Sequence, residues 1–137
     1  MINDIKELIL NHNDAREGIY ISISVDSYLE KIEKNAVIHA YYDGNQLKGF
    51  IAYYANDFLK GGYLTMILID KVNQGKKLGK LLLECSIQDL KNKGFHTYSL
   101  EVLKKNQRAV SFYNKYGFEI DEDREDMWLM KLNLIDS

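Results

Sequence analysis

The feature that most constrains the fold is a succession of strand, loop, helix, strand and helix patterns in the second half of the chain. Tyr63–Asp70 is rich in apolar and β-branched residues, and residues 78–90 carry apolar side chains at helical spacing. A second strand pattern, Thr97–Leu103, and a second helix pattern, 107–116, follow. A glycine, which is preferred just past a helix C-terminus, follows each helix pattern: Gly94 and Gly117. A helix that joins two strands predicts a crossover connection.

The rest of the chain predicts two short helices and further strands around this crossover. Apolar residues at helical spacing predict a helix near the start, and Ser27 with Glu30 forms a capping-box pattern that predicts a second helix over 28–34. Between them, the alternation of residues 19–25 predicts an extended connector. The predicted strands are 36–42, 47–54, 63–70, 97–103, 118–121 and 127–132. Asp43-Gly44-Asn45 predicts a hairpin turn between the first two strands, and the whole pattern indicates one α+β domain.

Size and charge exclude several classes of protein. With 137 residues, of which 46% are hydrophobic and 28% charged, the chain is long enough for one hydrophobic core and short for two. The formal net charge of −2 gives no basic footprint for nucleic acid. No apolar run approaches the roughly 18 to 20 residues that span a membrane, and the start of the chain has no signal-type pattern. We therefore expect a cytoplasmic protein.

The cysteine and histidine pattern predicts neither a disulfide nor a metal site. Cys85 is the single cysteine, so an intramolecular disulfide is excluded. Its place in an apolar run favours a buried packing residue over a reactive thiol. No Cys/His spacing suits zinc, so we expect no metal.

The loop Val72–Lys80 is the first segment with chemical content. It contains Gly75 and Gly79, lies between a strand and a helix, and carries a cluster of lysines: Lys76, Lys77 and Lys80. Unpaired backbone N–H groups and the helix dipole at such a point can hold a phosphate. The loop lacks the Gly-Lys-Ser/Thr of a P-loop and the Gly-x-Gly-x-x-Gly of a dinucleotide-binding fold. Taken alone, its two glycines are also compatible with a simple tight turn.

The second half of the chain resembles the GCN5-related N-acetyltransferase (GNAT) family. The residues that carry the resemblance keep the family's order and spacing: Gln74-Gly75-Lys76-Lys77-Leu78-Gly79, Leu100-Glu101-Val102, Asn106, Ala109, Phe112-Tyr113, Gly117-Phe118 and Met130-Lys131-Leu132. The resemblance implies a mixed, mostly antiparallel sheet of about six to seven strands flanked by about four helices. It assigns 1–137 to one domain, with an acetyl-CoA-binding core at 46–132 and acceptor-side helices and a first strand at 1–45.

The resemblance also implies how acetyl-CoA is bound. Backbone amides of the loop hold the pyrophosphate, and the loop's lysines add charge: Gln74, Gly75, Lys76, Lys77, Leu78, Gly79 and Lys80. The backbone of Ile67, Leu68 and Ile69 faces cofactor and thioester where two strands part. Asn106 bonds the pantetheine arm, although it also suits the N-cap of the last helix. Lys77 departs from the family pattern, which has glycine here, and a negative φ would let a lysine serve.

Two residues are the predicted catalytic pair. By resemblance, Tyr113 gives a proton to the leaving CoA thiolate, with core packing as the alternative. Glu101 is the first candidate for the base, because a carboxylate inside an apolar strand is costly without a task. A solvated Glu101, or one paired with a lysine, is the alternative. Asp70 and Tyr63 are weaker candidates for the base, and Asp70 also suits a cap of the loop.

The predicted activity is direct transfer of the acetyl group of acetyl-CoA to a primary amine of a small molecule or peptide. The alternative is a non-catalytic CoA-binding or regulatory module of the same fold. Residues 19–28 and an acidic turn are expected on the acceptor side, where carboxylates would favour a cationic amine: Asp121, Glu122, Asp123, Glu125 and Asp126. The sequence leaves the acceptor open among amino sugars, polyamines, amino acids and protein N-termini. It is equally compatible with a monomer and a homodimer.

Overall fold

A six-stranded sheet carries the fold, and its strand order is β1-β2-β3-β4-β6-β5. The computed structural model describes residues 1–13, 24–73 and 77–135. The strands are β1 (Val37–Asp43), β2 (Gln46–Asn56), β3 (Gly61–Ile69), β4 (Thr97–Leu103), β5 (Glu119–Arg124) and β6 (Met127–Asn133). All neighbouring strands are antiparallel except β3 and β4, which run parallel. The mixed, mostly antiparallel sheet of the prediction is confirmed.

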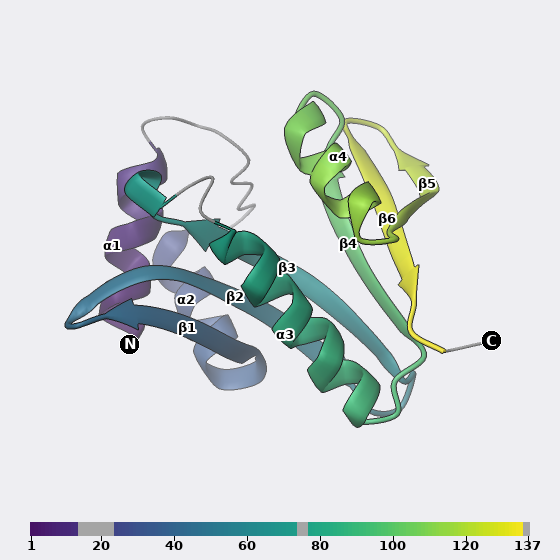
Figure 1. Ribbon diagram of the computed structural model, residues 1–137, viewed down its shortest axis with the longest axis horizontal. Coiled ribbons are helices and arrows are strands. Elements are labelled where there is room, and N and C mark those ends of the chain that lie inside the picture. Colours follow the sequence, from purple (N-terminus) through teal and green to yellow (C-terminus); the bar gives the residue numbers. More distant parts are fainter. Residues whose placement is uncertain (14–23, 74–76, 136–137) are drawn as a thin grey trace.

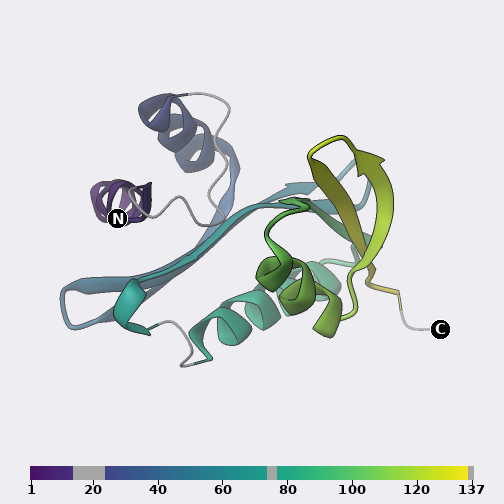
Figure 2. The ribbon, with the colours of Figure 1, turned by 90° about the horizontal axis from the view of Figure 1, so that it is seen from above.

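Helices cover both faces of this sheet. They are α1 (Ile2–Asn13), α2 (Val25–Asn35), α3 (Leu78–Asn92) and α4 (Gln107–Lys115), with a short 3-10 turn, η1 (Lys71–Asn73), before α3. Figures 1 and 2 show α1 and α2 on one face and α3 and α4 on the other. The helix α3 connects the parallel strands β3 and β4, as the crossover pattern predicted.

Two hydrophobic cores hold the layers together, one on each face. On the face of α3 and α4, the core includes Leu83, Leu90, Tyr98 and Phe118. On the face of α1 and α2, it includes Ile5, Ile9, Ile32 and Phe50. Every one of these eight side chains is essentially inaccessible to solvent. Burial of one such side chain contributes about 1.5 to 3 kcal/mol, so both faces stabilise the sheet.

The helix α2 begins three residues before the predicted start. Its N-cap is Ser24, whose hydroxyl accepts a 3.1 Å hydrogen bond from the backbone N–H of Ser27. The capping box of Ser27 and Glu30 is therefore not formed. The earlier start gives Leu29 and Ile32 a full helical turn ahead of them as they pack on the sheet. Most of the predicted connector, residues 19–23, lies outside the described residues.

Cys85 is exposed, so the prediction that it is buried was wrong. The helix α3 turns Leu82, Leu83 and Ser86 toward the sheet instead. Ser86 is polar yet fully buried, and it fits there because the hydroxyl of Tyr98 donates a 2.9 Å hydrogen bond to its Oγ. Ser86 in turn donates to the carbonyl oxygen of Leu83, so neither buried hydroxyl lacks a partner.

Candidate active site

The sheet opens between β3 and β4. The two strands pair from Gly61 with Thr97 to Leu64 with Leu100, and beyond that point β3 pairs with β2 and β4 with β6. At the same place the β2–β3 register shifts, so that Thr65 is an extra residue on β3. A bulge bends the strand that contains it. The bend therefore accompanies the opening of the sheet.

The predicted backbone contacts of the cofactor lie along this opening. Ile67, Leu68 and Ile69 belong to the part of β3 past its last pair with β4, where β2 is their strand neighbour. The side chains of Ile67 and Ile69 pack on the core beneath α3, whereas that of Leu68 belongs to the opposite core. One edge of this backbone therefore faces the opening.

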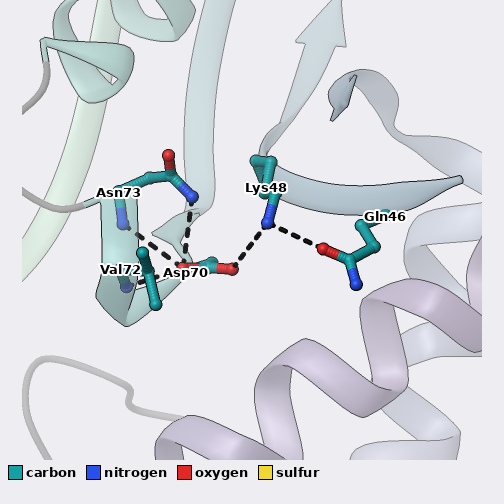
Figure 3. A network of polar contacts seen from close by, with 5 residues as sticks. All are labelled: Gln46, Lys48, Asp70, Val72 and Asn73. Carbon is teal, nitrogen blue, oxygen red and sulfur yellow. Dashed lines mark hydrogen bonds and ion pairs between the residues drawn. The ribbon is translucent and has the colours of Figure 1, made fainter. Parts of the chain in front are cut away.

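Asp70 anchors the turn that leads from β3 into α3 (Figure 3). Its Oδ1 accepts hydrogen bonds from the backbone N–H of Val72 at 2.7 Å and from the backbone N–H and side-chain amide of Asn73 at 3.3 Å. Its Oδ2 lies 3.7 Å from Nζ of Lys48, which also donates to Gln46. Burial alone would raise the pKa of Asp70, but these hydrogen bonds and Lys48 lower it. The carboxylate is engaged on both oxygens, which favours the cap over the base.

The start of α3 is the predicted phosphate site. Gln74, Gly75 and Lys76 lie outside the described residues. Lys77 is the N-cap, with φ +64°, and its side chain makes no capping hydrogen bond. The backbone N–H groups of the first turn therefore lack intrahelical acceptors, as at any helix start. The condition that Lys77 has a negative φ is not met, because the chain turns here through the left-handed region that favours glycine.

Gly79 keeps the first turn of α3 open. Among the described residues, a Cβ built on it would meet nothing closer than Cζ of Phe112, at 3.6 Å, which is an ordinary contact. The protein's own packing therefore does not require glycine at this position. A ligand that approaches the backbone closely would require it. Leu78 is buried beside it, and Lys80 is exposed, with Glu84 at 3.9 Å.

Asn106 serves as the N-cap of α4, as the alternative role predicted. Its Oδ1 accepts a 3.2 Å hydrogen bond from the backbone N–H of Ala109. Its side-chain NH₂ group makes no hydrogen bond within the described residues. Capping uses only the oxygen, so the amide nitrogen remains available to donate to a ligand.

Tyr113 lies on the same face of the sheet, in α4. Its side chain is 8% exposed and packs edge-on against Phe112 and Phe118, with ring centroids 5.4 and 5.8 Å away. Its hydroxyl makes no hydrogen bond in the described part of the chain. It is not fully sealed from solvent either, since among the described residues only the hydroxyl of Tyr54 is both buried and without a partner. Burial raises the pKa of Tyr113, so the phenol carries its proton at neutral pH.

Glu101 lies at the mouth of the opening, on the opposite face. It directly follows Leu100, the last residue of β4 that pairs with β3. Because Leu100 and Val102 point into the core beneath α3, Glu101 points to the other side. Its Oε1 accepts a 3.0 Å hydrogen bond from the hydroxyl of Tyr63, and its Oε2 lies 3.6 Å from Nη1 of Arg124. The alternative that Glu101 pairs with a lysine is replaced by a pair with an arginine.

Tyr63 is a donor in this arrangement. Burial raises its pKa first, and the charge of Glu101 raises it further. A phenol held protonated in this way is poorly suited to act as a base. Beside it, the hydroxyl of Tyr28 on α2 lies 3.0 Å from Oγ1 of Thr65, and burial raises the pKa of Tyr28 to about 12. These hydroxyls line the sheet on the face of α1 and α2.

Basic partners offset much of the charge of the acidic turn. Asp121 lies 3.4 Å from Nζ of Lys131, and Asp123 pairs with Lys104. Glu122 lies 3.2 Å from Nη2 of Arg124, so this guanidinium contacts two carboxylates. Arg124 was missed in the sequence. Its signal there was a single basic residue within the acidic run 119–126.

A match to a family model identifies the family of this chain. A model described as Acetyltransferase (GNAT) domain matches residues 10–130. The chain belongs to the GNAT acetyltransferase family. Over 57 residues it is 35% identical to N-alpha-acetyltransferase 30 of Schizosaccharomyces pombe (strain 972 / ATCC 24843). That segment makes up 42% of this chain and 38% of the relative, so the match spans well under two thirds of the relative's length.

Solved GNAT structures share the fold over nearly the whole chain. The ribosomal-protein-S18-alanine N-acetyltransferase of Escherichia coli superposes with a TM-score of 0.80 at 20% identity, covering 99% of this chain and 89% of that one. A GNAT acetyltransferase of Staphylococcus aureus Mu50 gives 0.81 at 22%, covering 98% and 93%. The PaiA N-acetyltransferase of Thermoplasma acidophilum, in complex with coenzyme A, gives 0.74 at 20%, covering 96% and 92%. Identities this low show a shared fold.

The described residues contain neither a cluster suited to a metal ion nor a helix suited to a membrane span. No three His, Cys, Asp or Glu side chains in residues 1–13, 24–73 and 77–135 lie together in a way that could hold a metal ion. In the same residues, no helix has the length and apolar character needed to cross a membrane.

Proposed function

We propose that this GNAT domain transfers the acetyl group of acetyl-CoA directly to a primary amine of a peptide or small molecule. The observation that carries the proposal is the opening between β3 and β4, with Tyr113 on one face and Glu101 on the other. Such an arrangement gives a thioester and an amine separate approaches to the same gap. In this proposal Tyr113 would be the proton donor on one side of the reacting atoms and Glu101 the proton acceptor on the other.

The residues on the face of α3 and α4 fit acetyl-CoA. The pyrophosphate would lie at the start of α3, where the first backbone N–H groups have no acceptor within the helix and Gly79 leaves room among the described residues. Lys77 and Lys80 are exposed there and would add positive charge. The pantetheine arm would run past the amide nitrogen of Asn106 and along the edge of β3 at 67–69. By sequence, residues 74–76 belong to the same site.

Each catalytic residue has a defined task in this proposal. Acetyl-CoA supplies a thioester whose carbonyl carbon an unprotonated amine can attack. Glu101 takes the proton that the amine gives up, either directly or through a water molecule. Tyr113 donates its phenolic proton to the departing sulfur, because a thiolate in a dry cleft is poorly stabilised. The proton that Glu101 has taken up is then released to solvent, and Tyr113 regains a proton from solvent. Tyr63 holds Oε1 of Glu101 in place while this happens.

Peptide amino termini are the acceptors to test first. Two similar proteins are named N-alpha-acetyltransferase 30 and ribosomal-protein-S18-alanine N-acetyltransferase; the first name specifies an α-amino group and the second an alanine of a ribosomal protein. The face that Glu101 shares with Tyr63 is open enough that the side chain of Glu101 remains 30% exposed. An amine held at the end of an extended peptide can reach such a group without entering a deep pocket.

A non-catalytic CoA-binding or regulatory module of the same fold is the second candidate, which the irregular Lys77 allows. A lysine in the left-handed region strains the turn that should hold the pyrophosphate. A binding module would have no use for the phenol of Tyr113, so replacing that residue by phenylalanine should leave its properties unchanged.

Binding and turnover measured together test the proposal. Calorimetry with acetyl-CoA gives the affinity, and a free-thiol assay with a panel of peptide and small-molecule amines gives the turnover. Binding with release of CoA in the presence of an amine supports the transferase. Binding without turnover on any amine of the panel supports the module, and absence of binding rules out both.

A further inference from the structure

Arg124 bridges two carboxylates on the face where the acceptor would bind. Its Nη1 lies 3.6 Å from Oε2 of Glu101, on β4, and its Nη2 lies 3.2 Å from Oε2 of Glu122, on β5. The strand β6 lies between them, and its Leu129 is in register with both glutamates. The guanidinium therefore connects β5 to β4 across an intervening strand. Among the described residues, Arg124 is the cation that forms an ion pair with Glu101.

The bridge contributes little to the stability of the fold. The side chains are substantially exposed: 42% for Arg124, 30% for Glu101 and 54% for Glu122. Ion pairs this exposed typically add little to the stability of a protein. The strands β5 and β6 are already held by their own pairing. The main consequence of Arg124 is thus the charge that it gives to the mouth of the opening.

The nearby lysines do not supply this positive charge in place of Arg124. Asp121 and Asp123 have lysine partners of their own, Lys131 and Lys104. With Arg124 present, the two glutamates and the guanidinium sum to one negative charge. Without it, two carboxylates would stand unopposed next to the arriving amine. One side chain therefore decides whether this mouth is nearly balanced or strongly acidic.

We propose that Arg124 is a specificity-determining residue that selects acceptors by the charge next to their amine. A second positive charge on the acceptor would come close to the guanidinium and be repelled, whereas a neutral or acidic group would be tolerated or attracted. The protein then discriminates against polyamines and against peptides with a basic second residue. This inference rests on the proposed function, in which Glu101 faces the amine.

The test uses matched acceptors that differ only in that charge. One series is a set of tetrapeptides with N-terminal alanine followed by glutamate, glutamine or arginine, and the other is the α-amides of the same three amino acids. For each series that is turned over, kcat and KM are measured for the wild-type chain, Arg124→Met, Arg124→Lys and Lys131→Met. Lys131→Met is the matched control, because it removes one positive charge whose partner is Asp121.

The expected result is a change in the preference between acceptors. The ratio of kcat/KM for the glutamate acceptor over the arginine acceptor should fall about three- to tenfold in Arg124→Met, mainly through KM, as for loss of a nearby exposed charge. Arg124→Lys and Lys131→Met should stay within about twofold of the wild type, and 0.5 M salt should shrink the effect. A ratio that Arg124→Met leaves unmoved, with turnover intact, overturns this inference alone. A wild-type chain that turns over neither series, nor any other amine of the panel used to test the proposed function, overturns that function and this inference with it.

Discussion

The hydroxyl of Tyr63, on β3, donates a 3.0 Å hydrogen bond to Oε1 of Glu101, on β4, at the point where the two strands part. The bond joins β3 to β4 next to Leu64 and Leu100, the last pair between these parallel strands, and holds the carboxylate at the mouth of the opening. Since Tyr63 is held protonated, it always donates. In the proposed function, Tyr63 would position Glu101 and would not exchange protons with the acceptor.

Tyr63→Phe should therefore slow the reaction by loosening Glu101. We expect kcat to fall about tenfold, because a small misplacement of a proton acceptor is costly, while acetyl-CoA affinity stays unchanged. Tyr28→Phe is the matched control, since the hydroxyl of Tyr28 contacts Thr65 and not Glu101. Steady-state kinetics and calorimetry on both variants measure the two quantities. An equal loss of kcat in both variants would contradict a specific effect on Glu101.

Tyr113→Phe should separate proton donation from binding. If Tyr113 gives its proton to the departing sulfur, kcat should fall about a hundredfold or more, and acetyl-CoA affinity should change less than about twofold. Tyr116→Phe is the control, because Tyr116 also contacts Phe112 but lies at the C-terminal end of α4. A Tyr113→Phe variant that keeps the wild-type rate would leave Tyr113 as a core residue and favour the binding module.

Lys77→Gly should relieve backbone strain at the start of α3. A side chain in the left-handed region costs about 1 to 2 kcal/mol, and glycine's greater freedom in the unfolded chain offsets part of the gain. We expect the free energy of unfolding to rise by about 1 kcal/mol and Tm by about 3 to 5 °C. Lys77→Ala removes the same charge but keeps a Cβ at positive φ, so its Tm should not rise. Comparing acetyl-CoA affinity in the two variants then isolates the effect of the backbone from that of the charge.

The sequence predicted the elements of the second half well, because strong local signals bound them. Thr97–Leu103 was found to the residue, since its alternation is unbroken, and asparagine and glycine mark the two ends of the helix after it. The start of α2 was missed because two serines three residues apart can each cap a helix. Packing of Leu29 and Ile32 on the sheet, which is not a local property, selected Ser24.

The opening of the sheet could not be predicted from side-chain pattern alone. Leu64 and Met66 are two residues apart and would share one face of a regular strand, yet they pack in opposite cores because Thr65 is an extra residue between them. The partner of Glu101 was missed for a related reason. Arg124 reaches it only because β6 lies between β4 and β5, an order fixed by the tertiary fold.

A second polar cluster, remote from the predicted catalytic pair, should make stability depend on pH. On the face of α3, the buried hydroxyl of Tyr53 donates a 2.5 Å hydrogen bond to Oδ2 of Asp89, which also lies 3.0 Å from Nζ of Lys93. Tyr53 has one proton and gives it to Asp89, so Nε2 of His39, 2.8 Å away, must be the donor to Tyr53. The carboxylate of Asp89 therefore holds one end of a chain that joins β1, β2 and α3.

Burial alone would raise the pKa of Asp89, but the hydrogen bonds from Tyr53 and Lys93 lower it below its usual value. A carboxyl group whose pKa is lower in the folded state stabilises the fold above its unfolded pKa, about 3.9, and this contribution is lost as the pH falls through the folded pKa. Asp89→Asn should therefore lower the free energy of unfolding by about 1 to 3 kcal/mol at pH 7, and this difference from the wild type should narrow toward pH 3.

Urea unfolding of both proteins at pH 7 and pH 3 measures the gap in the free energy of unfolding. Asp126→Asn is the control, because that exposed carboxylate makes no hydrogen bond or ion pair in the described residues. A gap for Asp89→Asn that stays constant with pH would mean that the ionised carboxylate is not what stabilises the cluster.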